Sequence, residues 1–491
     1  MNIEKEYFDI DAERAIRFCD QILDDFFEKV KTRKIVLRKG MAARILRHKL
    51  KDDDEKEFLS SNDHKTLNRR IEKLKLGLPP KECETNNFIN NMKLTFPPNF
   101  FWGTSTAAAQ VESASEHNWK GLKSKDGYTF NQTTDHEKRR MEDAKNILQF
   151  GSVYRCGVDW ARLQSEAFAP FDKAIVEEYQ AFFQHLNDHG TRIMFVIHHF
   201  TNPLWFENEK GWLTEDNISA FVDYARQCAE HFGEYTFSWN IFNEPNVYAL
   251  NGYVTGDFPP HKKNIFAGGK VLKNMGKAND IVYDILKEKY PDLPVGISFN
   301  TCYFKAKNPL GWLPATFTDW WFHTYAAGFF KKLDYWGISY YAFILFDPFP
   351  ITVPDNPEKF TKMGIPHDKM WGYKPEGLAQ NLRRFHKRFK KPMVITENGI
   401  CTDDSEVRIA SMKDYLKICH EAIADGIDLQ GYVHWCTWDN FEWALGPTYR
   451  FGLVTIDLET MERTMTDAGR FYAKVARENG IEIEEEEEKY Q

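Results

Sequence analysis

The 491-residue sequence has few of the features that mark a metal site or a disulfide framework. Its eight cysteines form no C-x-x-C pair and show no Cys/His spacing typical of zinc ligands. Scattered single cysteines of this kind are typical of buried thiols in a reducing compartment. We therefore expect neither a metal site nor disulfide bonds.

The sequence also lacks long apolar runs and an export signal. It contains no stretch of about 18 consecutive apolar residues, so no membrane-spanning helix is expected. Residues Met1–Tyr7 have neither the basic region nor the apolar region of a signal peptide. We expect a cytoplasmic protein without a membrane-spanning segment.

A third absence concerns nucleotide and nucleic-acid binding. No G-x-G-x-x-G or G-x-x-x-x-G-K-[ST] pattern follows any of the strands predicted below, which argues against a doubly wound nucleotide-binding sheet. The net charge of −8 disfavours nucleic acid as the principal partner.

Aromatic residues, in contrast, are plentiful. They make up 15% of the chain and include 14 Trp and 39 Phe. Two interpretations remain open at this point. The rings can pack a large core, or some can stack on the C–H faces of sugar rings.

Residues 1–94 differ in character from the rest, and we predict a helical N-terminal extension. Asp11 can cap a helix whose apolar residues recur at helical spacing up to Val30, and a second helix is predicted from Asn62. The segment Lys29–Lys51 contains many Lys and Arg and no acidic residue. It is either a solvated helix face or a surface for peripheral contact with anionic lipid, nucleic acid or an acidic partner.

From Leu94 the pattern alternates between strands and amphipathic helices such as those predicted at 172–189 and 217–232. Eight alternations predict a (β/α)₈ TIM barrel over residues 95–480, with functional side chains at the carboxyl ends of the strands. The predicted strands are Phe100–Thr104, Ser152–Trp160, Arg192–His198, Tyr235–Phe242, Leu293–Asn300, Leu333–Tyr340, Pro392–Thr396 and Gly431–Thr437.

The chain ends in a run of acidic residues, Glu484–Glu488. Because like charges repel and stay solvated, we predict a disordered acidic tail over residues 481–491.

Two of the predicted strands end in a carboxylate. Met393–Thr396 is followed by Glu397, Asn398 and a glycine, and Tyr235–Phe242 is followed by Asn243, Glu244 and a proline. One such glutamate could lie on an edge strand and reach water. Burial of an unpaired carboxylate costs several kcal/mol. A pair of strand-terminal carboxylates is what a retaining glycosidase needs, one as acid/base and one as nucleophile.

Several short motifs occur in order between Phe96 and Phe471. With them, the chain resembles the family 1 glycoside hydrolases. The motifs are Phe101-Trp102-Gly103-Thr104 with Gln110, Asn243-Glu244-Pro245, Thr396-Glu397-Asn398-Gly399, Trp435-x-x-x-Asp439-Asn440-Phe441-Glu442-Trp443 and Arg450-Phe451-Gly452-Leu453.

The resemblance implies roles for five residues in the chemistry. Glu244 would be the acid/base and Glu397 the nucleophile. Arg155 would support the charged nucleophile, since a guanidinium can hold a carboxylate by a bidentate contact. Tyr341 would bond the nucleophile through its hydroxyl, and Asn243 would bond the sugar 2-OH.

The resemblance also implies the residues that bind the substrate. Gln110, His199 and Glu442 would bind the sugar hydroxyls. The rings of Trp435 and Trp443 would flank the sugar, and Trp371 would form a platform for the aglycone.

The carboxylate of Glu442 would repel a 6-phosphate, so an unphosphorylated sugar is expected. Departures from the family pattern lie around the sugar pocket: Phe200 follows His199 where Trp is usual, Ser339 stands where Asn is usual, and Ser113 replaces a Gly.

We therefore predict a retaining β-glycosidase that acts on a small-molecule β-glycoside without a cofactor. A β-glucoside is the first choice, with β-galactoside or β-fucoside as the others, and the reaction passes through a covalent glycosyl-enzyme intermediate. Two alternatives stay open from the sequence. One is a catalytically silent sugar- or protein-binding relative, and the other is a transglycosidase that uses the same intermediate.

Overall fold

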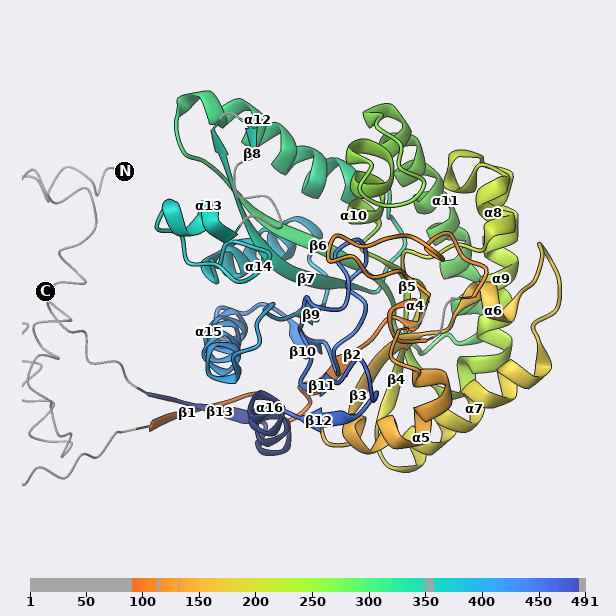
Figure 1. Cartoon of the computed structure of the whole chain (residues 1–491), viewed down its shortest axis with the longest axis horizontal. Coiled ribbons are helices and arrows are strands. Elements are labelled where there is room, and N and C mark those ends of the chain that lie inside the picture. Colours follow the sequence, from red (N-terminus) through yellow and green to blue (C-terminus); the bar gives the residue numbers. More distant parts are fainter. Residues whose placement is uncertain (1–90, 113–114, 132, 348, 351–356, 485–491) are drawn as a thin grey trace, which may run out of the picture. The chain divides into compact units, whose positions relative to one another are not determined.

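The computed structural model describes residues 91–112, 115–131, 133–347, 349–350 and 357–484 (Figure 1). The helices predicted before residue 91 and the basic segment Lys29–Lys51 lie outside the described residues.

Eight parallel strands close into a barrel, as the sequence predicts (Figure 1). Each strand pairs with its neighbours in the order β2, β3, β4, β5, β6, β7, β9 and β10, and β10 pairs with β2 to complete the ring. The strands are β2 (Phe101–Ser105), β3 (Val153–Gly157), β4 (Arg192–His198), β5 (Thr236–Asn243), β6 (Val295–Ala306), β7 (Tyr335–Asp347), β9 (Met393–Asn398) and β10 (Leu429–Trp435).

Helices connect successive strands of the barrel. The Asp172 carboxylate accepts hydrogen bonds from the first turn of α7, which is the cap expected at that position. The helices are α4 (Ala108–Val111), α5 (His136–Ile147), α6 (Trp160–Leu163), α7 (Lys173–Asp188), α8 (Leu204–Asn208), α9 (Asn217–Phe232), α10 (Pro245–Ala249), α11 (Ile265–Lys289), α12 (Pro309–Asp319), α13 (Pro357–Lys362), α14 (Glu376–Phe389), α15 (Ser405–Ala424) and α16 (Asp467–Glu478).

Strands β6 and β7 run past their predicted ends at Asn300 and Tyr340. Beyond those residues the two strands continue to pair with each other, for example Tyr303 with Phe343. The extra pairing is explained by aromatic and β-branched residues that favour strands. A short strand, β8 (Phe349–Pro350), then pairs with the end of β7.

The predicted boundaries at 94/95 and 480/481 are wrong, because both fall inside a two-stranded ladder. Strand β1 (Asn91–Thr95) pairs antiparallel with β13 (Gly480–Glu484). Ile481 is buried while Glu482 is exposed. The sequence-based prediction misses this alternation of buried and exposed residues because an acidic run follows it. The first residues of the predicted tail therefore belong to strand β13. The remaining small strands, β11 (Val454–Ile456) and β12 (Arg463–Met465), form a hairpin.

The barrel interior is filled by side chains from several strands. A small buried cluster is made of Val153, Met194, Tyr335, Val394 and Val433, which come from five different strands. Because side chains alternate along a strand, the next inward position above Val153 is Arg155. The packed layer therefore supports the polar side chains nearer the carboxyl end.

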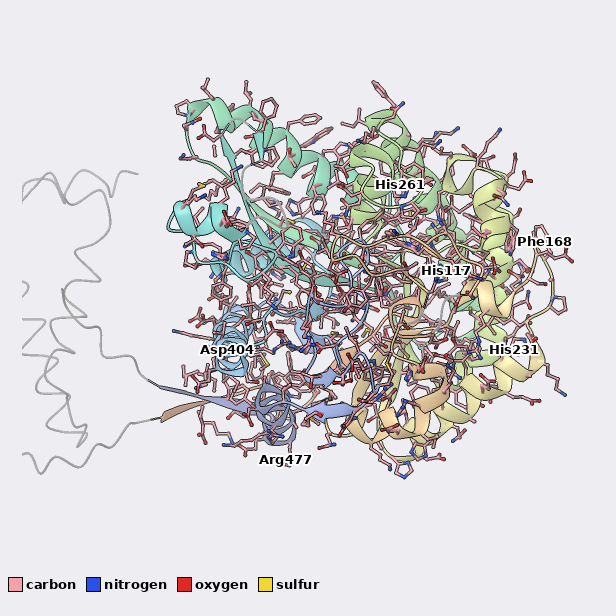
Figure 2. All side chains as sticks on the ribbon, in the orientation of Figure 1. His117, Phe168, His231, His261, Asp404 and Arg477 are labelled. Carbon is pink, nitrogen blue, oxygen red and sulfur yellow. The ribbon has the colours of Figure 1, made fainter. Side chains whose placement is uncertain are left out.

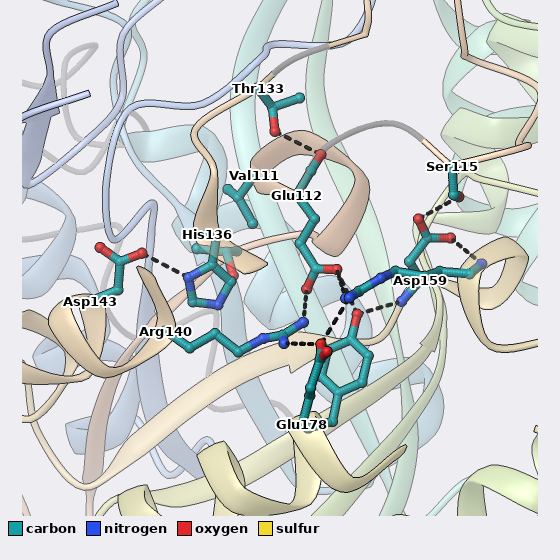
Figure 3. A network of polar contacts seen from close by, with 12 residues as sticks. Val111, Glu112, Ser115, Thr133, His136, Arg140, Asp143, Asp159 and Glu178 are labelled. Carbon is teal, nitrogen blue, oxygen red and sulfur yellow. Dashed lines mark hydrogen bonds and ion pairs between the residues drawn. The ribbon is translucent and has the colours of Figure 1, made fainter. Parts of the chain in front are cut away.

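A buried polar network braces the segment after β2 against the neighbouring helices (Figure 3). Glu112 pairs with Arg140 and accepts a hydrogen bond of 2.6 Å from the Tyr179 hydroxyl. The same network includes Asp143, which pairs with His136 at 2.8 Å and with Arg463 at 2.8 Å. These contacts fix the segment that carries Gln110.

None of the helices in the described ranges is both long and apolar enough to cross a membrane.

We expect the substitution Asp143→Ala to lower the free energy of unfolding by about 3–5 kcal/mol, because it leaves the Arg463 guanidinium buried without its partner. Urea denaturation of the two proteins measures the difference. The matched control is Asp284→Ala, which breaks an exposed pair with Lys332 and should cost less than about 1 kcal/mol. Equal losses in the two variants would contradict this account.

Candidate active site

A chain of hydrogen bonds connects the side chains at the carboxyl end of the barrel, and Arg155 is at its centre. This residue of β3 is fully buried. Its Nη1 donates to Glu397 Oε1 at 2.7 Å and to Ser105 Oγ at 3.0 Å. Its Nη2 donates to Asn243 Oδ1 at 2.5 Å and to Ser298 Oγ at 2.8 Å. One guanidinium therefore joins strands β2, β3, β5, β6 and β9.

The two oxygens of Glu397 have separate partners. Arg155 holds Oε1, and the Tyr341 hydroxyl donates to Oε2 at 3.0 Å. Burial raises the pKa of this carboxyl, while Arg155 and the Tyr341 hydrogen bond act in the opposite direction. Both contacts favour the charged carboxylate and fix its orientation.

Glu244 follows directly after β5 in an unusual backbone conformation. Its φ of 42° lies in the left-handed region, which costs a non-glycine residue roughly 1–2 kcal/mol. Phe200 (φ 66°) and Trp443 (φ 42°) share this feature, and all three lie at the carboxyl end of the barrel. Strained backbone of this kind tends to concentrate at functional sites.

The Glu244 carboxyl differs from Glu397 in its surroundings. Asn300 Nδ2 donates a hydrogen bond to Glu244 Oε1 at 2.8 Å. Burial and the negative charge of Glu397 raise the pKa of Glu244 to about 8. Because Arg155 and Tyr341 stabilise the charge on Glu397, the proton near neutral pH belongs on Glu244. The site thus pairs a protonated acid with an ionised carboxylate.

His199 is oriented by the same chain of contacts. Arg155 occupies the Asn243 oxygen, so the Asn243 amide nitrogen is the atom that faces His199 Nε2, at 2.8 Å. Nε2 must then accept, which leaves the proton on Nδ1. Burial lowers the pKa of His199 well below its usual value, so the ring is neutral. The buried Nδ1 has no hydrogen-bond partner among the described residues.

Gln110 and Glu442 lie within hydrogen-bond distance of each other. Gln110 Nε2 donates to Asn440 Oδ1 at 3.1 Å and lies 3.3 Å from Glu442 Oε2. Burial and the charge of Glu397 raise the pKa of Glu442 to about 8. Gln110 Oε1 is buried and has no partner among the described residues, so it can accept a hydrogen bond from a ligand hydroxyl.

Aromatic rings line the same region. The ring of His199 lies 5.9 Å from Trp435 and 5.8 Å from Trp443, measured between centroids. Trp443 also packs on Trp119 at 4.9 Å and on Phe200 at 5.1 Å. The region therefore combines polar groups with apolar ring faces, as sugar binding requires.

Seven of the eleven site residues predicted from the sequence are joined by hydrogen bonds and ring contacts, namely Arg155, Glu397, Tyr341, Asn243, His199, Trp435 and Trp443. The charge of Glu397 contributes to the raised pKa of Glu244 and of Glu442, and Gln110 donates to Glu442. The exception is Trp371, which lies between α13 and α14. Its backbone N–H donates to Asp368, and its described contacts do not reach the carboxylates.

Sequence reasoning did not single out Asn300, Ser298 or Ser105 as members of the site. Asn300 could have been found, because it ends the predicted strand 293–300 just as Glu244 follows the strand before it. The two serines give no comparable signal. Their role depends on the position of Arg155, which only the folded chain shows.

Within the described ranges, no group of three or more His, Cys, Asp or Glu side chains is placed to hold a metal ion.

Comparison with known proteins identifies the family. The model of the family described as Glycosyl hydrolase family 1 matches residues 92–311 and 325–481. Beta-glucosidase A of Thermotoga maritima is 28% identical over 451 residues, which cover 79% of this chain and 99% of that protein.

Solved structures give the same result. The beta-glucosidase from Thermotoga maritima in complex with deoxynojirimycin superposes with a TM-score of 0.70 at 26% identity, over 79% of this chain and all of that chain. The beta-glycosidase from Pyrococcus horikoshii has a TM-score of 0.71 at 28% identity, over 80% of this chain and 97% of that chain. The chain therefore belongs to glycosyl hydrolase family 1 and is a glycoside hydrolase.

Proposed function

We propose that the protein is a retaining β-glycosidase that removes a terminal, unphosphorylated β-linked sugar through a glycosyl–Glu397 intermediate. A β-glucoside is the first candidate substrate, because the relatives reported above include a beta-glucosidase. The proposal rests on one observation, which is that the two carboxyls have different electrostatic surroundings. Arg155 and Tyr341 donate hydrogen bonds to Glu397 and counteract the rise in its pKa that burial causes, while Glu244 forms no ion pair among the described residues and has a pKa raised to about 8.

In the first step, Glu397 attacks the anomeric carbon while Glu244 gives its proton to the departing oxygen. The C–O bond to the aglycone breaks as the bond to Glu397 Oε forms. Loss of negative charge on Glu397 removes one of the causes that raise the pKa of Glu244. Glu244 can then remain ionised after it has given up its proton.

In the second step, the ionised Glu244 accepts a proton from a water molecule, and the resulting hydroxide attacks the anomeric carbon. The bond to Glu397 breaks, and both carboxyls return to their starting states. The sugar leaves with its β configuration, because two displacements each invert the anomeric carbon. An acceptor alcohol in place of water would give transglycosylation by the same route.

The sugar hydroxyls would be held by the polar atoms that the protein leaves without partners. His199 Nδ1 can donate and Gln110 Oε1 can accept. Glu442, whose pKa is raised to about 8, can accept a hydrogen bond as a carboxylate and donate one when it is protonated. Asn243 would bond the 2-OH, and Trp435 and Trp443 would flank the ring.

Trp371 remains the proposed aglycone platform. It lies in the segment between α13 and α14, where its backbone N–H donates to Asp368, and the assignment rests on the family resemblance.

Replacing the two glutamates should have different consequences. We expect Glu397→Ala to lower kcat by roughly four orders of magnitude or more, since no group remains to form the intermediate. Glu244→Ala should lower kcat/KM by roughly 10²–10⁴-fold on a substrate with a poor leaving group, and much less on an activated aryl β-glucoside. Steady-state kinetics on the two kinds of substrate measures the difference.

Azide gives the control for this pair of variants. With Glu244→Ala, azide needs no general base and should accelerate turnover and yield the β-glycosyl azide. Near wild-type hydrolysis by Glu397→Ala, or an α-glycosyl azide from Glu244→Ala, would contradict the assigned roles.

The pH dependence of kcat/KM should be bell-shaped. Activity should fall at low pH as Glu397 becomes protonated, and at high pH as Glu244 loses its proton near pH 8. Tyr341→Phe removes a hydrogen bond that lowers the pKa of Glu397, so the acidic limb should move to higher pH. Initial rates of aryl β-glucoside hydrolysis across the pH range measure both limbs.

Glu442→Gln is the matched control, because Glu442 also has a pKa raised to about 8. This variant should raise KM yet keep the alkaline limb. Loss of that limb in Glu442→Gln, or an unmoved acidic limb in Tyr341→Phe, would show that other groups control the profile.

A further inference from the structure

The outward face of α12 is apolar, although it is exposed. Six large side chains on α12, the π-helical segment Trp320–Tyr325 that follows it and β8 form what we call the α12 patch. Its members, with their exposed fractions, are Leu310 (73%), Trp312 (59%), Leu313 (69%), Phe317 (53%), Trp320 (46%) and Phe349 (76%).

This arrangement reverses the usual polarity of a surface helix. Residues 309–318 contain no charged side chain, and the buried positions of α12 are the small residues Gly311 and Ala315. A surface helix ordinarily buries its large apolar residues and exposes charged ones. Single exposed apolar residues are common, but a continuous group of this kind marks an interaction surface.

The patch lies at the same end of the barrel as the catalytic carboxyls. Strand β6 contributes Asn300 to the site and then runs on to Ala306, just before α12. At about 3.3 Å per residue, this stretch of β6 spans roughly 20 Å. Figure 1 shows α12 and β8 together at the far ends of β6 and β7. Whatever covers the patch therefore lies near the mouth of the barrel.

The charged side chains around the patch are compatible with binding to an anionic surface. Asp319 pairs with Arg384, and Asp347 pairs with Lys307. Lys305 is exposed beside them.

We propose that the α12 patch docks the protein onto the surface of a lipid bilayer. Trp, Phe and Leu exposed on one face of a helix are side chains that insert into the membrane interface. The charges at the edge of the patch favour this occupant over a second copy of the chain, because Asp319 and Asp347 are each paired within the chain while Lys305 is exposed. This cationic edge attracts an anionic membrane, whereas two copies would bring the same charges together.

The test is binding of the full-length protein to vesicles of phosphatidylcholine, with and without phosphatidylserine, measured by flotation. The wild type should bind, and binding should rise with phosphatidylserine and fall with added salt. The variant Trp312→Ser/Leu313→Ser/Phe317→Ser should lose about tenfold or more in partition coefficient, because each large side chain no longer leaves water.

The matched control removes three other exposed apolar side chains, Met141 (51%), Phe168 (59%) and Val407 (46%), in Met141→Ser/Phe168→Ser/Val407→Ser. Phe168 lies on the opposite side of the view from α12 (Figure 2). This variant should bind as the wild type does. Thermal unfolding shows whether each variant is folded, and Leu310→Ser/Phe349→Ser provides a second patch variant if the first is unstable.

Three results would overturn the proposal. They are absence of wild-type binding to either vesicle, equal binding by folded patch and control variants, and a wild-type dimer in solution that the patch variant dissolves without any vesicle binding. The last result would identify the patch as a contact between copies of the chain.

Discussion

The buried ion pair between Arg155 and Glu397 is the interaction on which the rest of the site depends. The two side chains are 0% and 5% exposed, and their closest atoms are 2.7 Å apart. Burial of two charges is costly even when they are paired, so a pair of this kind is weak evidence for stability. The ion pair instead serves to orient the side chains around it. The same guanidinium sets the Asn243 amide, and through it the tautomer of His199.

The two carboxyls of the site differ in pKa because they have different neighbours. Both carboxyls are buried, and burial alone would raise the pKa of each. Glu397 lies against a cation and a tyrosine hydroxyl, while Glu244 receives an amide hydrogen bond and faces a negative charge. Two side chains with the same chemistry therefore acquire different protonation states. The left-handed backbone at Glu244 adds local strain, which the surrounding barrel must offset.

Much of this could be predicted from the chain alone, because the barrel repeats one simple pattern. Strand β4 and helix α9 begin and end where the hydrophobic pattern predicts. The prediction failed where local pattern was not the deciding factor. Strands β6 and β7 extend by pairing with each other, and Ile481 enters a ladder although acidic residues follow it. Likewise, Ser298 and Ser105 belong to the site only because the folded barrel brings them to Arg155.

The central claim is that Glu397 forms a covalent bond to the sugar, and its most direct test is labelling with a 2-deoxy-2-fluoro-β-glucosyl fluoride. The fluorine at C2 slows both steps, while the anomeric fluoride, a good leaving group, keeps the first step accessible, so the intermediate should accumulate. Mass spectrometry of the digested protein should find one fluoroglucosyl group, carried by Glu397. A protein that turns over β-glucosides but carries no adduct, or carries it on another residue, would contradict the account.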